Sequence, residues 1–452
     1  MNLVYKVNDR PRFLQLIVFA FPPLLAILAA TIAVPAIIGH GMSQSAALFG
    51  AGVGTIVYLL FTKFKSPVFL GSSFAFLGSM GAAFSGAATA GATENLGFAG
   101  LLIGAVFAGL VYVIIALFVK IGGVSWVRKL MPAVVIGPTV AIIGLSLAGN
   151  AIGNSFGFSS PQTSYTMTGA LWVNLVCALV TLLTVIFFSV KGSKMLKLIP
   201  FILGIIAGYL VALVFTLIGR ATGNDTLKIL DFAAFEGMTL FQVPEFTFTK
   251  AFEGFKEISG QYLASIAVAY VPVAFVVFAE HIADHRNLST IIGQDLLEEP
   301  GLHRTLLGDG VGSMAGAFFG GCPNTTYGES VGCVAITGNA SIVTILTTAI
   351  LAIAASFFSP FVTFLSTIPT CVMGGVCITL YGFIAVSGLK MLQPVDLNDN
   401  RNLFTASVIL IAGIGGMTLN IGAVTLTEVA CALILGVIVN LLFNRPARDS
   451  NK

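Results

Sequence analysis

Long apolar segments separated by short polar loops constrain the fold of this chain more than any other feature of its sequence. Most of them have the length of about 17 to 25 residues that a helix needs to cross a bilayer. Lipid offers no hydrogen bonds to the backbone, so such segments are expected to be helices. Charged residues make up only 9% of the chain, against about 25% in soluble domains. The sequence therefore predicts an all-α integral membrane protein with apolar spans at 13–39, 46–62, 96–120, 130–150, 168–190, 198–219, 262–285, 302–320, 341–359, 370–391, 402–420 and 424–444.

Two further apolar segments, 68–82 and 322–338, are shorter and rich in glycine. Pro67 precedes the first and Pro323 lies in the second, and a proline lacks the N–H that a helix interior needs. We expect each segment to cross as a short extended strand continued by a helix, which brings the total to fourteen spans. Irregular backbone at membrane depth is tolerated where it lines a cavity. The segments are therefore candidate halves of a binding site, with a tight re-entrant turn as the alternative.

The distribution of basic residues supports fourteen spans with both termini in the cytoplasm. Cytoplasmic loops of membrane proteins are enriched in Lys and Arg. Four basic residues fall outside, all in the long loop 220–260, namely Arg220, Lys228, Lys250 and Lys256. The other eighteen fall inside: Lys6, Arg10, Arg12, Lys63, Lys65, Lys120, Arg128, Lys129, Lys191, Lys194, Lys197, Arg286, Arg304, Lys390, Arg401, Arg445, Arg448 and Lys452.

The loop 220–260 divides the spans into two groups of seven, and an odd number per group predicts an inverted repeat. Three matches in the same order support it. They are Pro23 and Thr31 with Pro272 and Glu280, Pro132 to Gly137 with Pro369 to Gly374, and Gly71 to Phe74 with Asn324 to Tyr327.

Acidic residues inside the spans point to a substrate or ion pathway. Glu280 and Asp284 are four residues apart, so they share one face of a helix. Two like charges in a medium of low dielectric constant repel, so at least one is expected to take up a proton. This suits a proton-coupled carrier. Alternatively, Asp284 and His285 are solvated groups at the cytoplasmic boundary, while His281 packs in the core.

The third acid, Glu329, ends the second broken segment and marks the expected site; its alternative role is to pair with a buried base. Phe74 and Tyr327 can flank a flat ring, and short hydroxyls at Ser73, Thr325 and Thr326 can bond to it or cap helix ends. Asp309 either holds a neighbouring helix or lies at a boundary. The six cysteines form no C-x-x-C pair and are expected to be small buried residues.

Several functions lack sequence support. The net charge of +3 suggests no nucleic-acid partner. There is no phosphate-binding loop, no metalloprotease motif and no serine-hydrolase motif in a useful position. An integral-membrane enzyme would need a nucleophile with its base or a set of metal ligands, so we expect no enzyme activity, no cofactor and no metal.

Three stretches resemble the uracil permease branch of the nucleobase–ascorbate transporter family. They are Ala279-Glu280-His281-Ile282, the run from Asp295 to Arg304, and Pro323-Asn324-Thr325-Thr326-Tyr327-Gly328-Glu329. The resemblance extends over nearly the whole chain. It implies 14 transmembrane segments in a 7+7 inverted repeat, with short extended strands in the broken third and tenth spans. It also implies a core domain formed by 1–125 and 259–365 and a gate domain formed by 126–258 and 366–452.

The function that the resemblance implies is symport of uracil with protons across the bacterial cytoplasmic membrane, by a multi-pass protein that forms a homodimer. Glu280 and Glu329 would bond to the pyrimidine, with backbone N–H groups of Phe74 and Gly328 contributing. Other expected substrate contacts are Tyr327, Ser73, Tyr381 from the gate side, and Thr31, the repeat counterpart of Glu280. Proton coupling would use Glu280, Asp284 and Glu329, and the proton would be the coupling ion.

The chain departs from the family pattern at three places. Ser330 stands where Asn is usual, Asp284 where His is common, and Phe21-Pro22-Pro23 where a Gln-His pair is common. The nearest rival function is transport of a purine such as xanthine or urate, whose carriers generally have Gln at the position of Glu329. A second rival is an anion carrier or channel of the same architecture, for which a basic residue is expected at the site.

Overall fold

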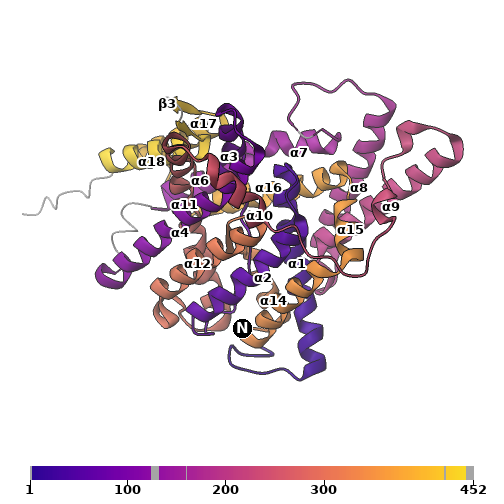
Figure 1. Ribbon diagram of the computed structural model, residues 1–452. Helices are drawn as coiled ribbons and strands as arrows, with labels where there is room; N and C mark the ends of the chain where they lie inside the picture. Colours follow the sequence, from indigo (N-terminus) through magenta and orange to yellow (C-terminus); the bar gives the residue numbers. More distant parts are fainter. Residues whose placement is uncertain (1–2, 124–131, 159, 422–423, 444–452) are drawn as a thin grey trace, which may run out of the picture.

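The structure is a computed structural model that describes residues 3–123, 132–158, 160–421 and 424–443 (Figure 1). Within these residues, eight helical segments are long and apolar enough to cross a membrane, and they correspond to eight of the twelve long spans that the hydropathy pattern predicted. They are α1 (Phe13–Ile38), α2 (Gln44–Phe61), α4 (Glu94–Gly122), α6 with α7 (Ala133–Ser146 and Ala148–Ser155), α8 (Gly169–Lys191), α9 (Pro200–Thr222), α11 (Gly260–Ile292) and α16 (Thr370–Met391).

Eight further α-helices complete the bundle among the described residues. They are α3 (Leu77–Thr89), α10 (Thr247–Gly254), α12 (Leu302–Gly320), α13 (Gly328–Thr337), α14 (Ile342–Phe357), α15 (Ser359–Ser366), α17 (Asn400–Ile414) and α18 (Glu428–Phe443). The expected domain boundary at 125/126 and five of the expected cytoplasmic residues, Arg128, Lys129, Arg445, Arg448 and Lys452, lie outside the described residues.

The two broken segments meet, as predicted. Strand β1 (Leu70–Ser72) pairs antiparallel with β2 (Asn324–Thr326), and Gly71 lies opposite Thr325. The backbone N–H of Ser73 extends the pairing with a bond of 2.9 Å to the carbonyl of Pro323. Each strand runs into a helix, β1 through a short 3-10 turn into α3 and β2 into α13. Pairing satisfies the polar backbone that the breaks leave without helical partners.

The last two predicted spans are shorter as helices than their apolar sequence suggests. Helix α17 ends at Ile414 and α18 begins at Glu428, and between them β3 (Leu419–Ile421) pairs antiparallel with β4 (Val424–Leu426). The expectation of continuous apolar spans over 402–420 and 424–444 was therefore wrong at their facing ends. The physical reason is glycine, because Gly415 and Gly416 follow the helix and Gly416 has φ +67°, which stops it.

Helix α12 is held tightly between α2 and α4, in contact with both. A side chain at Gly54 of α2 would place its Cβ 2.7 Å from the carbonyl oxygen of Gly312, and the converse contact has the same length. Only glycine allows backbones to approach this closely, as in other membrane helix pairs. The α2–α12 pair therefore forms a stiff support behind the broken spans.

The remaining contacts group the helices. Helix α16 packs against α6, α7 and α8, and α17 packs against α6 and α18, whereas α12 packs against α2 and α4, and α14 packs against α2. In Figure 1, α8 and α9 stand on one side of the molecule and α17 and α18 on the other. The N-terminal leader lies on the turn between α13 and α14, where the N–H of Val4 bonds to the carbonyl of Gly338 at 2.8 Å.

Candidate functional site

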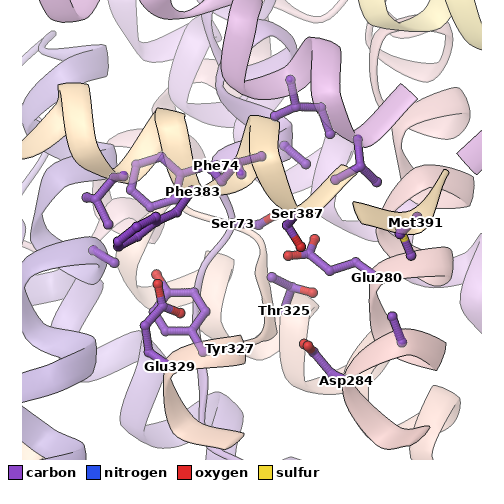
Figure 2. Close-up of a pocket in the computed structure, with 18 residues that line it drawn as sticks. Ser73, Phe74, Glu280, Asp284, Thr325, Tyr327, Glu329, Phe383, Ser387 and Met391 are labelled. Atoms are coloured by element: carbon purple, nitrogen blue, oxygen red, sulfur yellow. The ribbon is translucent and has the colours of Figure 1, made fainter. Parts of the chain in front are cut away.

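A cavity of about 360 Å³ lies where the paired strands meet α6, α11 and α16 (Figure 2). The strands and the helices that continue them contribute Ser73, Phe74, Ala75, Thr325, Tyr327, Gly328 and Glu329. The other helices contribute Ala30, Val140, Ile143, Glu280, Ala283, Asp284, Leu380, Phe383, Ile384, Ser387 and Met391. Its volume lies in the lower part of the range of about 300 to 1,000 Å³ found for small-molecule sites.

Three carboxylates define the chemistry of the cavity. Glu280 and Asp284 come from one face of α11, and Glu329 lies in the first turn of α13. Among the described residues that line the cavity there is no Lys, Arg or His. The carboxylates therefore offer hydrogen-bond acceptors for donors on a ligand. The N-terminus of α13 adds N–H donors that have no partner within the helix.

The broken spans are fixed to each other and to α11 by side-chain hydrogen bonds. The hydroxyl of Tyr327 donates to the backbone carbonyl of Ser72 at 2.7 Å, and the hydroxyl of Thr326 donates to Oδ2 of Asp284 at 2.8 Å. Gly71 leaves room for the Tyr327 ring, because a Cβ at this position would lie 2.6 Å from two ring carbons. The floor of the cavity is thus held by contacts that lie within or next to it.

Seven of the predicted substrate and coupling residues meet in this cavity. They are Ser73, Phe74, Glu280, Asp284, Tyr327, Gly328 and Glu329. Two others are buried but do not line it. Thr31 is fully buried behind β1, and Tyr381 meets Phe74 edge-on, with ring centroids 5.9 Å apart.

Sequence reasoning missed the wall that α16 contributes. Leu380, Phe383, Ile384, Ser387 and Met391 line the cavity from this helix. Their spacing of three or four residues places them on one face of a helix, and Ser387 is the polar member of the set. That spacing was the available signal, whereas Tyr381 lies outside this face.

One alternative for α11 was that Asp284 and His285 are solvated groups at the cytoplasmic boundary. Asp284 lines the cavity, and His285 is 0% exposed. The interpretation of His285 as a solvated boundary group was therefore wrong. Packing of His281 in the core is confirmed, and its Nδ1 lies 2.7 Å from Oδ2 of Asp309. Asp309 thus has the helix-holding role that was one of its two expected roles.

The prediction for the cysteines can also be compared with the structure. All six cysteines are buried and free, as expected for small core residues. Within the part of the chain that the structure describes, no group of three or more His, Cys, Asp or Glu side chains is arranged to hold a metal ion.

Comparison with known families gives a match over most of the chain. The family model Xan_ur_permease, described as "Permease family", matches residues 14–422. A uracil permease of Bacillus caldolyticus is 40% identical over 452 residues, covering 99% of this chain and 96% of the relative. A uracil permease of Escherichia coli K12 is 34% identical over 440 residues, covering 97% of this chain and 93% of the relative.

Solved structures of other transporters share the fold at low sequence identity. The transmembrane domain of the cyanobacterial bicarbonate transporter BicA has a TM-score of 0.62 at 16% identity, covering 96% of this chain and 99% of that chain. The murine anion transporter Slc26a9 in the inward-facing state has a TM-score of 0.64 at 13% identity, covering 96% and 69%. The resemblance drawn from the motifs is confirmed: the chain belongs to the Xan_ur_permease family, the nucleobase–ascorbate transporters, and is a multi-pass membrane transporter, not an enzyme.

Proposed function

We propose that the protein imports uracil across the bacterial cytoplasmic membrane in symport with protons. The observation that carries this proposal is the cavity, where three carboxylates and two aromatic rings meet at the paired breaks of two spans. Relatives at 34% to 40% identity that cover nearly the whole chain carry the name uracil permease.

The cavity matches the hydrogen-bonding groups of a pyrimidine. Uracil has two ring N–H donors, which the carboxylates of Glu280 and Glu329 can accept. Its carbonyl oxygens can accept from the backbone N–H groups of Phe74 and Gly328, at the starts of the helical segments that follow β1 and β2. Phe74 and Tyr327 supply aromatic faces for the ring. Ser73 also lines the cavity and carries a hydroxyl group.

Coupling to protons follows from the charge of the substrate. Uracil is neutral at pH 7, so its accumulation must draw on a coupled ion. Glu280, Asp284 and Glu329 share one small cavity, and repulsion between them favours the uptake of a proton by at least one. A Na⁺ site would need several oxygen ligands arranged around the ion, whereas a proton needs a single carboxylate.

The architecture that we propose has fourteen spans in a 7+7 inverted repeat. A core domain of 1–125 and 259–365 would hold the site, and a gate domain of 126–258 and 366–452 would move against it. The packing of α16 with α6 and α8, and of α2 with α12 and α14, supports this division. Both termini would be cytoplasmic and the protein would form a homodimer, as the family resemblance implies.

Alternating access would come from movement of the core past the gate. The β1–β2 pairing and the Thr326–Asp284 bond join the substrate groups into one body. The gate wall of the cavity consists mainly of apolar side chains of α6 and α16, with one hydroxyl at Ser387. A mostly apolar wall can slide past the core without breaking a network of hydrogen bonds. Tyr381 and Thr31 would stabilise the aromatic and strand residues from behind.

Uptake into proteoliposomes tests the proposal against its rivals. We expect saturable uptake of labelled uracil that excess unlabelled uracil abolishes and excess xanthine leaves intact. Equal competition by xanthine would favour the purine carrier, and uptake of bicarbonate or chloride without uracil would favour the anion carrier. Liposomes without protein, and liposomes with the Glu329→Gln variant, are the matched controls.

A further inference from the structure

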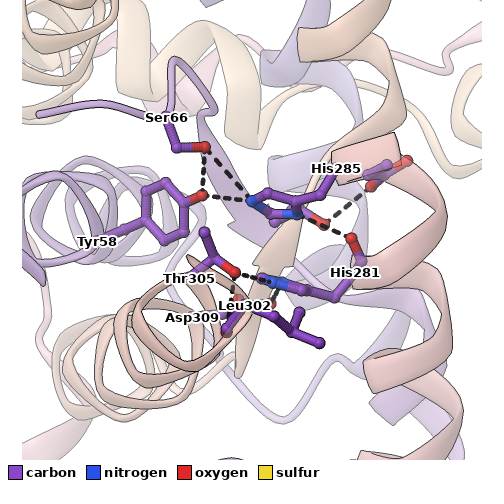
Figure 3. Close-up of polar contacts among 9 residues, drawn as sticks. Tyr58, Ser66, His281, His285, Leu302, Thr305 and Asp309 are labelled. Carbon is purple, nitrogen blue, oxygen red and sulfur yellow. Dashed lines mark hydrogen bonds and ion pairs between the residues drawn. The ribbon is translucent and has the colours of Figure 1, made fainter. Parts of the chain in front are cut away.

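The side of α11 that faces away from the cavity carries a second pair of titratable side chains. His281 and His285 each follow a cavity carboxylate by one position, which rotates them by about 100° around the helix. Both are fully buried, and their rings stack with centroids 4.0 Å apart. Figure 3 shows that they point toward α2 and α12. The function proposed above assigns them no role.

His281 is joined to α12 through both ring nitrogens. The hydroxyl of Thr305 donates to the carbonyl of Leu302 at 3.1 Å, so it accepts from Nε2–H of His281 at 3.0 Å. Nδ1 of His281 lies 2.7 Å from Oδ2 of Asp309, and one proton is shared between these two atoms. Either atom can carry it. The pair has no net charge in either arrangement, which lowers the cost of burying it.

His285 is joined to α2 one turn further along. Its Nδ1 lies 2.8 Å from the backbone carbonyl of His281, and a carbonyl can only accept, so Nδ1 carries the proton. In the neutral ring Nε2 lies 2.6 Å from the hydroxyl of Tyr58. The hydroxyl of Tyr58 donates to that of Ser66 at 2.7 Å, and the hydroxyl of Ser66 lies 3.4 Å from Nε2 of His285.

The two histidines are thus attached to a single pair of packed helices, α2 and α12. Tyr58 belongs to α2, and Thr305 and Asp309 belong to α12. The two helices meet through the close approach of Gly54 and Gly312 described above. A rotation of α11 about its axis would break the bonds of both histidines at once. It would also turn Glu280 and Asp284 out of the cavity.

We propose that His281, His285 and Asp309 form a rotational lock, in which they act as positioning residues for the cavity carboxylates. Asp309 acts through His281, and Tyr58 acts through His285. The lock sets the direction of Glu280 and Asp284 before a ligand arrives, so that no reorganisation is needed on binding. That this direction matters for uracil rests on the proposed function.

Three variants separate a positioning role from a general effect on stability. His281→Phe keeps an aromatic ring but removes two hydrogen bonds and leaves Asp309 buried and unpaired. In His281→Phe combined with Asp309→Leu, the unpaired carboxyl group is gone and the hydroxyl of Thr305 still donates to the carbonyl of Leu302, so stability should largely recover. The control is Tyr262→Phe, which removes two buried hydrogen bonds, to the carbonyls of Ala83 and Leu96, near the other end of α11.

Two measurements are made on each variant, namely uracil affinity by calorimetry and the rate at which a maleimide labels the thiol of an added Ala283→Cys substitution. Ala283 lines the cavity, and the native cysteines are buried, so the parent gives the background. With the His281–Asp309 half of the lock removed, uracil should bind about tenfold more weakly, as expected for the loss of charge-assisted bonds. The thiol should also be labelled more slowly because it turns away from the cavity.

The double variant gives the deciding result. The lock predicts that its melting temperature recovers relative to His281→Phe, while its affinity and labelling stay reduced and Tyr262→Phe keeps both at parental values. Parental affinity and labelling in the double variant would overturn the proposal, as would equal losses in Tyr262→Phe. If the parent does not bind uracil, the proposed function fails, but labelling still decides the lock. Should the double variant not fold, Tyr58→Phe supplies the same comparison by removing one hydroxyl.

Discussion

The hydroxyl of Thr326 donates a hydrogen bond of 2.8 Å to Oδ2 of Asp284, which joins strand β2 to helix α11 beneath the cavity. One carboxylate oxygen is thus fixed by the broken span, while the side chain still lines the cavity. Protonation of Asp284 would therefore change the hydrogen bond that attaches α11 to β2. This relationship gives Asp284 a defined role to test.

We expect Asp284→Asn to bind uracil nearly normally but to fail to accumulate it against a gradient. The amide oxygen can still accept from Thr326, so the geometry is kept, but the amide cannot take up or release a proton. Calorimetry and proteoliposome uptake measure the two properties separately. Thr326→Ser, which retains the hydroxyl, is the matched control. If the Asn variant concentrates uracil like the parent, Asp284 has no part in coupling.

Glu329 should contribute directly to affinity. An ionised carboxylate only accepts hydrogen bonds, which suits the ring N–H groups of uracil, whereas an amide presents a donor beside its acceptor. Glu329→Gln is expected to weaken binding by about 1.5 to 3 kcal/mol, the range for a hydrogen bond to a charged group. Isothermal titration with uracil measures this, with Glu94→Gln at the start of α4 as a control far from the cavity. Unchanged affinity would remove Glu329 from the site.

Gly71 should tolerate no side chain. A Cβ there would lie 2.6 Å from the Tyr327 ring and 3.0 Å from Oγ1 of Thr31. Gly71→Ala is expected to cost about 1 to 3 kcal/mol of stability through overpacking and to weaken uracil binding by moving Tyr327. Gly78→Ala on α3 is the control, since a Cβ at that position would have open space around it out to 4 Å. Thermal unfolding and calorimetry of both variants test this, and equal behaviour would contradict it.

A hydrogen bond outside the membrane gives a prediction about pH. The pKa of Glu257 is lowered from its ordinary value by the hydroxyl of Thr93 first and by the backbone N–H of that residue second. A pKa that is lower in the folded state means that the contribution to stability is complete above the ordinary value of about 4.3. It is lost as the pH falls through the lowered folded value.

Glu257→Gln should therefore lower the melting temperature slightly at pH 7, with the difference from the parent closing at low pH. The effect is small because the pair is exposed. Unfolding in detergent at pH 7 and at about pH 3, below the ordinary carboxyl pKa, measures it. Glu253→Gln, which loses only the surface pair with Lys256, is the comparison. A difference of the same size at both values would contradict the assignment.

The sequence predicted the parts of the site that depend on chain breaks and helical periodicity. Pro67 and Pro323 forced the strands, and the spacing of Glu280 and Asp284 placed them on one face. These signals are local, so they can be read without knowing which helices pack together. The spacing of Phe383 and Ser387 on α16 is an equally local signal for the cavity-facing side of that helix. The sequence analysis selected Tyr381 instead.

Burial could not be read from the sequence in the same way. His285 stands beside Arg286 and was open to interpretation as a solvated group. Its burial depends on Tyr58, which is 227 residues away in the chain and whose hydroxyl lies 2.6 Å from Nε2 of the ring. The pairing of His281 with Asp309 depends likewise on how α12 packs. To predict that α17 and α18 are shortened, the helix-stopping effect of Gly415 and Gly416 would have to be judged stronger than the apolar character of the surrounding residues.

Uptake of labelled uracil into proteoliposomes with an imposed proton gradient tests the central claim most directly. The three carboxylates of the cavity should make accumulation depend on protons, so uptake should rise as the external pH is lowered. It should collapse when a protonophore is added, and should not change when external Na⁺ is replaced by K⁺. Uptake that ignores the proton gradient but follows the Na⁺ gradient would contradict the account of Glu280, Asp284 and Glu329 as the coupling groups.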